Sequence, residues 1–338
     1  MILAGDIGGT KTVLAILEKD ASGKLISLKE QVFSSQQFLA FNDVLDVFLP
    51  KVCQIKSVCF GVAGPVVNQR CQVTNLPWLL DEDDLKVRFQ GAQVKLLNDL
   101  EAMALGMLHL SEDQLVELNP NAENQTGNIA VIAPGTGLGE ALLIWNGQKF
   151  QSIATEGGHT DFAPVNHRQD LLLAYLRRLF PDHVSYERIL SGIGFSYLYD
   201  FICANKIAEP SNLVPQVSDA IDRNAIISQL GLEGIDKACV ETLMLFVEIF
   251  GAETGNLTLK SLATGGVFIG GGTLKSLATG GVFIGGGICP NIVAALQNGV
   301  FIEAFKAKGR FNALLDKVSI KLSLNPRTPL IGAIKYFS

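Results

Sequence analysis

Residues 2–18 read ILAGDIGGTKTVLAILE, and this stretch decides the fold class. Glycines that end an apolar run are typical of a tight turn. The pattern therefore predicts a buried strand over Ile2–Asp6, a turn at Gly8–Thr10 and a returning strand over Thr12–Glu18. The same order returns at residues 128–145, which read NIAVIAPGTGLGEALLIW. The chain has two blocks that each open on a strand, a Gly/Thr turn and a second strand.

Outside these hairpins, short strands alternate with helical patterns. Further strands are predicted at Leu25–Phe33, Ser57–Val62 and Val94–Leu97. Amphipathic or apolar periodicity predicts helices at Phe38–Leu49, Leu100–Leu110, Asp170–Phe180, Glu187–Leu198, Asp219–Leu230 and Ile235–Thr254. Mixed strands and helices in two restarting blocks, over 338 residues, favour a two-domain α/β protein.

The composition points to a protein with real cores and small-molecule partners. It is 48% hydrophobic and 18% charged, which excludes a disordered chain or a coiled coil. The 27 Lys and Arg residues against 33 Asp and Glu give a net charge of −6, whereas nucleic-acid binders usually carry a basic surplus. We expect no nucleic-acid partner.

The chain shows no leader pattern and no apolar run of the length that a membrane helix needs, so we expect a cytoplasmic protein with no membrane partner. Its six cysteines are scattered and form no CxxC pair, which favours reduced, buried thiols over disulfides or zinc ligands.

One segment is duplicated. Residues 258–272 read TLKSLATGGVFIGGG, and residues 273–287 repeat them letter for letter. An old structural repeat would have diverged, so we interpret this as a recent or engineered tandem duplication. Either copy can supply a strand from GGVFIGGG. Closing fifteen extra residues into a loop costs only roughly 2–3 kcal/mol, and we expect the fold to survive.

The two glycine turns are candidate phosphate sites. In the segment Asp6–Thr12, glycines let backbone N–H groups approach an anion, the Thr10 hydroxyl can donate to a phosphate oxygen, and Asp6 can orient Mg²⁺ or its waters. The alternative is an ordinary hairpin turn. Neither a P-loop nor a dinucleotide fingerprint is present. The second turn, Gly135–Gly139, leads into a strand instead of a helix, which argues against a dinucleotide fold and favours a second phosphate turn.

Asn98 and Asp99 stand where a strand ends and a helix begins. One of the two can be the helix N-cap, a position that both residue types favour. Ligands of open α/β sheets also bind at the carboxyl ends of strands, where a carboxylate can act as general base. The residues alone leave both interpretations open.

Three further polar residues stand in or beside glycine-rich segments. Glu156 and His159 have the Glu-x-x-His spacing of a di-iron helix, but two glycines lie between them and the motif has no second copy, which disfavours a metal site. A loop that presents a carboxylate and an imidazole suits a polyhydroxyl ligand better. Glu187 stands at a predicted helix start, and the alternative role for it is that of a capping acid.

Taken in order, these motifs resemble the bacterial glucokinase family, within the larger group of sugar kinases, actin and heat-shock ATPases. The matching segments cover nearly the whole chain: DIGGTKT (6–12), LLNDLEAMA (96–104), APGTGLGEALL (133–143), ATEGGHTDFAP (154–164), SYERILSGIG (185–194), GGVFIGGG with Ile288–Pro290, Arg310–Phe311 and Pro329–Ala333. GGVFIGGG is similar to the adenosine segment of that family.

The resemblance implies ATP-dependent phosphorylation of the 6-hydroxyl of glucose. It makes Asp99 the base that takes the hydroxyl proton, and it places the sugar among Asn98, Asp99, Glu156, His159 and Glu187. The phosphates would be lined by Asp6, Gly8, Gly9, Thr10, Lys11, Thr12, Gly135, Thr136 and Gly137. Mg²⁺ would arrive with ATP, near Asp6, with no metal site formed by protein ligands alone.

The resemblance also implies a ribonuclease-H-like fold of the actin and hexokinase type, with two domains and a cleft between them. The small domain would comprise residues 1–105 plus about 323–338, and the large domain residues 106–322. The sequence leaves open whether the protein forms a homodimer. The ROK branch of sugar kinases carries a zinc motif, CxCGxxGC, which this sequence lacks, so that branch and its zinc are excluded.

Two rival functions remain at this stage. The duplication falls across the adenosine segment, so the chain could be a catalytically impaired member that binds sugar or nucleotide without transfer. An actin-like or chaperone-like ATPase of the same fold would hydrolyse ATP without sugar and would not need Glu156, His159 and Glu187.

Overall fold

The computed structural model describes residues 1–50, 54–215, 223–270 and 288–338, and shows a mixed α/β protein. The chain divides into two compact units. The first comprises Met1–Ser111, Ser152–Ala154 and Arg327–Ser338, and the second comprises Glu112–Gln151 and Thr155–Pro326. The domain boundaries expected from the sequence, after residues 105 and 322, stay a prediction.

The first unit contains a five-stranded sheet with strand order β3-β2-β1-β4-β7. Strands β1, β2 and β3 are antiparallel neighbours, whereas β1, β4 and β7 run parallel. The strands are β1 (Ile2–Ile7), β2 (Lys11–Lys19), β3 (Leu25–Ser34), β4 (Ser57–Val62) and β7 (Gln93–Asn98), with a separate pair β5 (Arg70–Gln72) and β6 (Leu79–Asp81). The helices are α1 (Phe41–Phe48), α2 (Glu82–Arg88), α3 (Asp99–Met107) and α12 (Thr328–Lys335).

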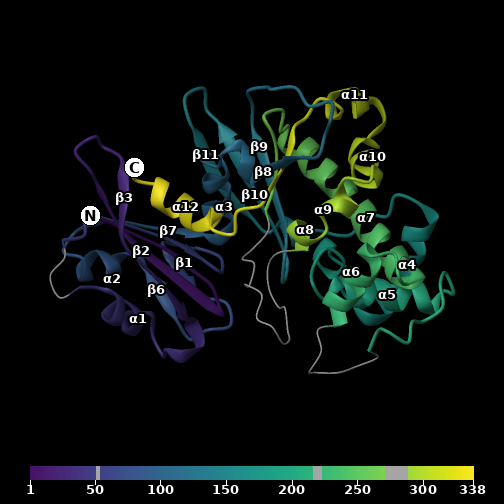
Figure 1. The fold of residues 1–338 in the computed structure, drawn as a ribbon, viewed down its shortest axis with the longest axis horizontal. Coiled ribbons are helices and arrows are strands. Elements are labelled where there is room, and N and C mark those ends of the chain that lie inside the picture. Colours follow the sequence, from purple (N-terminus) through teal and green to yellow (C-terminus); the bar gives the residue numbers. More distant parts are fainter. Residues whose placement is uncertain (51–53, 216–222, 271–287) are drawn as a thin grey trace. The chain divides into compact units, whose positions relative to one another are not determined.

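Strand alternation gives this sheet two different faces. Leu3 and Ile7 join the large apolar side chains that pack against α1. Ala4 and its small neighbours face the opposite way, against α3 and α12. Those two helices lie side by side over that face (Figure 1). Alternating large and small apolar residues in β1 therefore set which helices cover each face.

The second unit repeats this topology with a sheet of order β11-β10-β9-β12-β13-β8. Strands β9 and β10 form an antiparallel hairpin, and β9, β12 and β13 run parallel. The strands are β8 (Leu115–Glu117), β9 (Ile129–Pro134), β10 (Leu138–Trp145), β11 (Phe150–Thr155), β12 (Gly266–Ile269) and β13 (Ile320–Ser323). Each unit thus starts from a glycine-turn hairpin whose first strand pairs with a parallel neighbour.

The helices of the second unit build its large apolar core, which includes the long helix α7 and strands β9, β12 and β13. In Figure 1, α4, α5, α6 and α7 form one helical group. The helices are α4 (His167–Leu179), α5 (Gly194–Ala204), α6 (Arg223–Leu232), α7 (Lys237–Ser261), α8 (Ile288–Asn291), α9 (Val293–Leu296), α10 (Val300–Lys306) and α11 (Asn312–Leu315).

Among the described residues, no helix combines the length and the hydropathy required to cross a bilayer.

Two predicted helices differ from the structure. The helix predicted at Glu187–Leu198 is wrong in its first half: residues 186–188 form one 3₁₀ turn and α5 begins only at Gly194. Helix α7 runs past its predicted end at Thr254 to Ser261. The hydroxyls of Thr254, Thr258 and Ser261 donate to carbonyls four residues earlier. The extension is held by packing, because Leu257 and Thr258 are buried. Part of the helix predicted at Asp219–Leu230 lies outside the described residues.

The first copy of the duplicated segment supplies strand β12. Its residues Gly266–Ile269 lie between β9 and β13 and pair in parallel with both. The second copy, residues 273–287, lies outside the described residues. The question of which copy forms the central strand is therefore answered in favour of the first.

Candidate active site

The first unit has a candidate site where three of its parallel strands end. Ile7, Val62 and Asn98 are level with one another in the register of β1, β4 and β7. The first glycine turn follows β1 directly, and it is closed by the Gly8 N–H group, which donates to the Lys11 carbonyl at 2.9 Å. Thr10 is exposed on this turn. The carboxyl ends of the strands therefore bring the first turn and the Asn98–Asp99 pair to one edge of the sheet.

Asp6 and Asp99 are close enough to influence each other electrostatically. Burial, followed by the charge of Asp99, raises the pKa of Asp6 to about 7, against an opposing effect of Lys11. The charge of Lys11 therefore compensates the two carboxyl groups only in part. Such a pair of carboxyl groups suits a cation that also contacts the phosphates of a substrate.

Asn98 is the N-cap of α3. Its Oδ1 accepts a hydrogen bond from the Leu100 N–H group at 2.9 Å, and its backbone N–H donates to Glu101 at 3.2 Å, which completes a capping box. Its side-chain amide also donates to the Gly64 carbonyl at 3.0 Å. The capping interpretation is thus correct for Asn98, and its amide keeps a second N–H for a ligand.

Asp99 occupies the first position of α3, where the helix dipole favours a negative charge. Its Oδ1 accepts the Leu100 N–H group at 2.9 Å, and the residue is half-buried. The helix itself is held by close packing against α12, because a Cβ atom at Gly332 would lie 1.8 Å from the Ala102 carbonyl oxygen. The C-terminal segment Pro329–Ala333 therefore fixes the helix that carries Asp99.

Ser35 supports the first glycine turn, a role that no sequence pattern predicted. The Ser35 side chain is fully buried, and its Oγ donates to the Gly8 carbonyl at 2.7 Å. Its backbone N–H donates to the Thr10 carbonyl at 3.0 Å. Thr12 is fully buried as well, and its hydroxyl lies 2.9 Å from Ser35 Oγ. The Thr12 side chain thus contacts Ser35. This contact differs from the direct contact with phosphate that was predicted for Thr12.

We expect Ser35→Ala to raise KM for ATP by roughly threefold to tenfold, with KM for glucose unchanged. The substitution removes the hydroxyl that contacts both Gly8 and Thr12 and leaves a buried carbonyl without its donor, which costs about 1–3 kcal/mol of stability. Steady-state kinetics and thermal unfolding measure the two effects. Ser27→Ala, at an exposed serine of β3, is the control. A lower Tm with unaltered KM for ATP would assign Ser35 to stability alone.

The second unit has its own candidate site, built around the turn between β9 and β10. The Gly135 N–H group donates to the Gly137 carbonyl at 2.7 Å, and the Gly192 N–H group donates to the Gly135 carbonyl at 2.8 Å. Thr136 is exposed on the turn. The turn therefore resembles the first one in its position within the sheet, after the first strand of the hairpin.

Glu187 joins this turn to the predicted sugar loop. Its Oε2 accepts the N–H group of Leu138 at 2.9 Å, and its Oε1 lies 3.7 Å from Nε2 of His159. The two segments are held together by the Tyr186 N–H group, which donates to the Thr160 carbonyl at 3.0 Å. Glu187 is thus no capping acid of a long helix. It links two candidate ligand-binding segments.

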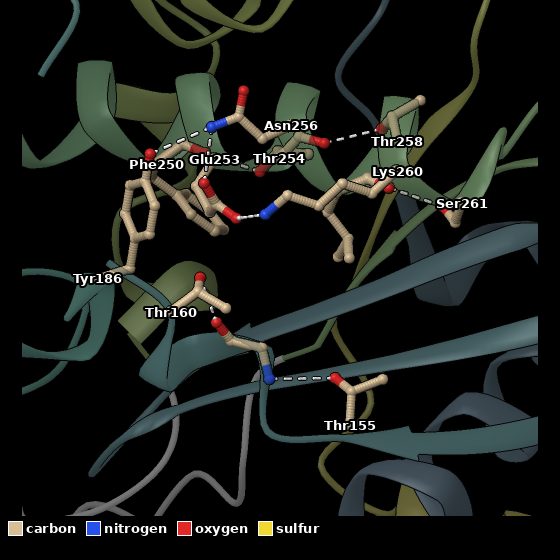
Figure 2. A network of polar contacts seen from close by, with 12 residues as sticks. Thr155, Thr160, Tyr186, Phe250, Glu253, Thr254, Asn256, Thr258, Lys260 and Ser261 are labelled. Carbon is tan, nitrogen blue, oxygen red and sulfur yellow. Dashed lines mark hydrogen bonds and ion pairs between the residues drawn. The ribbon is translucent and has the colours of Figure 1, made fainter. Parts of the chain in front are cut away.

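Glu156 and His159 lie on a single 3₁₀ turn, Gly157–His159, with Glu156 as its N-cap. Both side chains are exposed. Thr155 and Thr160 hold the turn from either end, because Thr155 Oγ1 accepts the Gly157 N–H group at 3.2 Å and Thr160 Oγ1 donates to the Gly157 carbonyl at 2.7 Å (Figure 2). This is the short irregular loop that the two glycines predicted, and not a metal-binding helix.

The candidate sites of the two units differ in their chemistry. The first unit has two carboxyl groups, a helix N-terminus and a glycine turn, and the second has carboxylates, an imidazole and a glycine turn. Within the ranges that the structure describes, no group of three or more His, Cys, Asp and Glu residues could hold a metal ion alone. The adenosine segment predicted at residues 280–287 lies outside those ranges, and its continuation forms α8.

Comparisons with known proteins agree with these features. The profile of the glucokinase family matches residues 3–276 and 273–338, so each match contains one complete copy of the duplicated segment. The glucokinase of Trichormus variabilis is 35% identical over 348 residues, which cover 98% of this chain and 97% of that protein. A crystal structure of glucokinase from an Antarctic psychrotroph is 32% identical, with a TM-score of 0.81 over 98% of this chain and 97% of that chain.

A more distant likeness concerns the fold alone. The crystal structure of a ROK family glucokinase from Streptomyces griseus, in complex with glucose and AMPPNP, is 18% identical and has a TM-score of 0.60. It covers 98% of this chain and 97% of that chain.

Proposed function

Because the chain belongs to the bacterial glucokinase family, we propose that it transfers the terminal phosphoryl group of ATP to the 6-hydroxyl of glucose, with Asp99 as general base. The family makes the chain a glucokinase enzyme that phosphorylates sugar. The observation that carries the finer proposal is the position of Asp99, at the N-terminus of α3 beside Asp6 and the first glycine turn. A base is needed where the hydroxyl nucleophile meets the phosphate.

The roles divide between the two units. In the first, Asp99 accepts the hydroxyl proton, Asn98 offers its amide to the sugar, and the turn at Gly8–Thr10 binds phosphate oxygens. In the second, Glu156, His159 and Glu187 hydrogen-bond sugar hydroxyls, while the turn at Gly135–Gly137 receives phosphate. Transfer requires these groups to act on the same pair of substrates, so the proposal assigns to the working enzyme an actin-type fold whose two domains close over them.

ATP and Mg²⁺ are the proposed co-substrate and cofactor. Two carboxyl oxygen donors and an incomplete set of protein ligands fit Mg²⁺, which usually binds through one or two carboxylates together with substrate phosphates. Asp6 would hold it, with Asp99 nearby. When bound, Mg²⁺ neutralises phosphate charge during transfer. The AMPPNP in the Streptomyces griseus protein supports ATP as the nucleotide.

The experiment is a coupled assay for ADP formation with and without glucose. We expect ADP to form only when glucose is present, in the full chain and in a variant that lacks residues 273–287. Since the two copies are identical, that variant is a single-copy parent whichever copy is removed. It is the control for the duplication.

Each rival function gives a different result. Glucose binding without turnover in the full chain, together with turnover in the single-copy variant, would support a catalytically impaired member. ADP formation that does not depend on glucose would support an ATPase of the same fold. Either result would overturn the proposal for this chain.

A further inference from the structure

We propose that Glu140 is a positioning residue, which in its uncharged form holds the Glu156–His159 turn in the shape that binds sugar. The inference rests on the proposed sugar-binding role of that turn. Glu140 lies on β10, three residues after Gly137, and only 2% of its surface is exposed. It therefore acts from beneath the turn, away from any ligand.

The Glu140 side chain is packed against the turn with no spare space. A Cβ atom at Gly157 would lie 2.0 Å from Glu140 Oε2, so the carboxyl group fills the volume that any larger residue would need. The backbone carbonyl of Glu140 accepts a hydrogen bond from Thr155 Oγ1 at 2.9 Å, and the same hydroxyl oxygen accepts the Gly157 N–H group. A change in the position of Glu140 would thus affect Gly157 in two ways: through its contact with the carboxyl group, and through the Thr155 hydroxyl that bonds both residues.

The carboxyl group of Glu140 is not fully hydrogen-bonded. Its Oε1 is buried and has no hydrogen-bond partner among the described residues. A buried carboxylate with an unpaired oxygen is costly, whereas a protonated carboxyl group carries no net charge to stabilise. The geometry therefore favours the uncharged form.

The neighbouring charges act in the same direction. Glu253 on α7 is fully buried, and it accepts hydrogen bonds from Asn256 at 2.8 Å and from the Lys260 ammonium group at 3.2 Å (Figure 2). Lys260 is thus already paired with one carboxylate. If Glu140 carried a negative charge as well, it would have to share the Lys260 ammonium group with Glu253.

Other titratable groups surround this network from the elements packed on it. Tyr186 accepts a hydrogen bond from the Asn256 amide at 3.1 Å, and the Lys308 ammonium group donates to Asn256 Oδ1 at 2.7 Å. Burial lowers the pKa of Lys308 and raises that of Tyr186. Glu156, His159 and Glu187 lie on the ligand side of the turn. Lys260 is the cation that faces Glu140 most directly.

Burial, followed by the charge of Glu253, raises the pKa of Glu140 to about 7, against an opposing effect of Lys260. The folded protein therefore binds this proton more tightly than the unfolded chain does. The stability that it contributes is present below the ordinary glutamate pKa of 4.5 and is lost as the pH rises to about 7. The turn should lose its shape as the pH rises through about 7, where Glu140 ionises.

The test compares the wild type with Glu140→Gln and Glu140→Ala in KM for glucose, at saturating ATP, on both sides of pH 7. In the wild type we expect KM, one pH unit above the pKa, to reach about tenfold its low-pH value, because only the protonated fraction is competent. Glu140→Gln, which keeps the shape and cannot ionise, should hold KM at the low-pH wild-type value throughout. Glu140→Ala should raise KM at every pH.

Glu140→Gln separates the titration of Glu140 from that of other groups, because the variant removes the Glu140 carboxyl group and retains the others. Asp6, whose pKa burial also raises, belongs to the first unit and is unchanged in this variant. The matched control is Glu209→Gln, which changes an exposed glutamate of the second unit. A rise of KM for glucose in Glu140→Gln equal to that of the wild type would overturn the proposal, as would equal losses in Glu140→Gln and Glu140→Ala at low pH.

A readout that needs no sugar separates this proposal from the proposed function. Amide hydrogen exchange at Gly157–His159 should accelerate in Glu140→Ala and remain slow in Glu140→Gln. In the wild type, the exchange rate, corrected for the intrinsic effect of pH on exchange, should increase as the pH rises through 7. Absence of glucose binding in the wild type would overturn the proposed function alone. Unchanged exchange in Glu140→Ala would overturn the positioning role, whatever the ligand.

Discussion

Asp99→Asn should lower kcat by a factor of about 10²–10⁴ while glucose still binds with nearly its original affinity. The amide has the size of the carboxylate, and its oxygen can still accept the Leu100 N–H group at the start of α3. It cannot accept a proton from the sugar hydroxyl, so the substitution removes the base and little else. Steady-state kinetics give kcat, and calorimetric titration without nucleotide gives Kd for glucose.

The control for this substitution is Asp84→Asn. Asp84 also lies in the first turn of a helix, α2, and is exposed. The two variants thus each lose a carboxylate from the first turn of a helix, and only Asp99→Asn should lose turnover. A kcat within about threefold of the wild type would remove Asp99 as the base.

Glu187→Ala should reduce kcat/KM for glucose by roughly 10²–10⁴. The carboxylate accepts the Leu138 N–H group of the second glycine turn and lies beside the His159 imidazole. Its loss removes interactions with a charged group worth about 1.5–3 kcal/mol each, one with the backbone and one with a sugar hydroxyl. Because Glu187 contacts the turn as well as the sugar loop, we expect kcat to fall and KM to rise.

Glu187→Gln separates the two contacts. The amide oxygen can replace the carboxylate oxygen at Leu138, so we expect a smaller loss, roughly tenfold. Glu209→Ala, at an exposed glutamate of the same unit, should leave kcat/KM unchanged. If Glu187→Ala retained wild-type kcat/KM for glucose, the sugar-binding role of Glu187 would have to be abandoned.

The elements that the sequence predicted well are those set by local pattern. The hairpins β1-β2 and β9-β10 follow from apolar runs that end in glycines, and β4 was predicted with the bounds that the structure has. The helix predicted at Glu187–Leu198 failed in its first half because residues 186–188 form a separate 3₁₀ turn, and α5 starts only at Gly194. The end of α7 was missed because tertiary packing overrides local propensity there: Leu257 and Thr258, beyond the predicted end, are buried.

The same division between locally determined features and long-range contacts applies to the candidate site residues. Asn98 and Asp99 could be placed at a strand end from sequence, and so could the two glycine turns, because each depends on a few neighbouring residues. Ser35 gave no signal, since its partners Gly8 and Thr12 are more than twenty residues away in the chain. The contact of Glu187 with the second turn spans 49 residues and was missed for the same reason.

The sequence by itself determined the two hairpins, their glycine turns, the family and the residue types available for catalysis, because local backbone geometry and apolar pattern are written in consecutive residues. Only the tertiary structure decided that the first copy of the duplicated segment forms β12, that Ser35 supports the first turn, and that Glu140 lies buried under the sugar loop. These depend on contacts between distant segments and on exclusion of water. A carboxyl group acquires an unusual proton affinity only when folding has surrounded it.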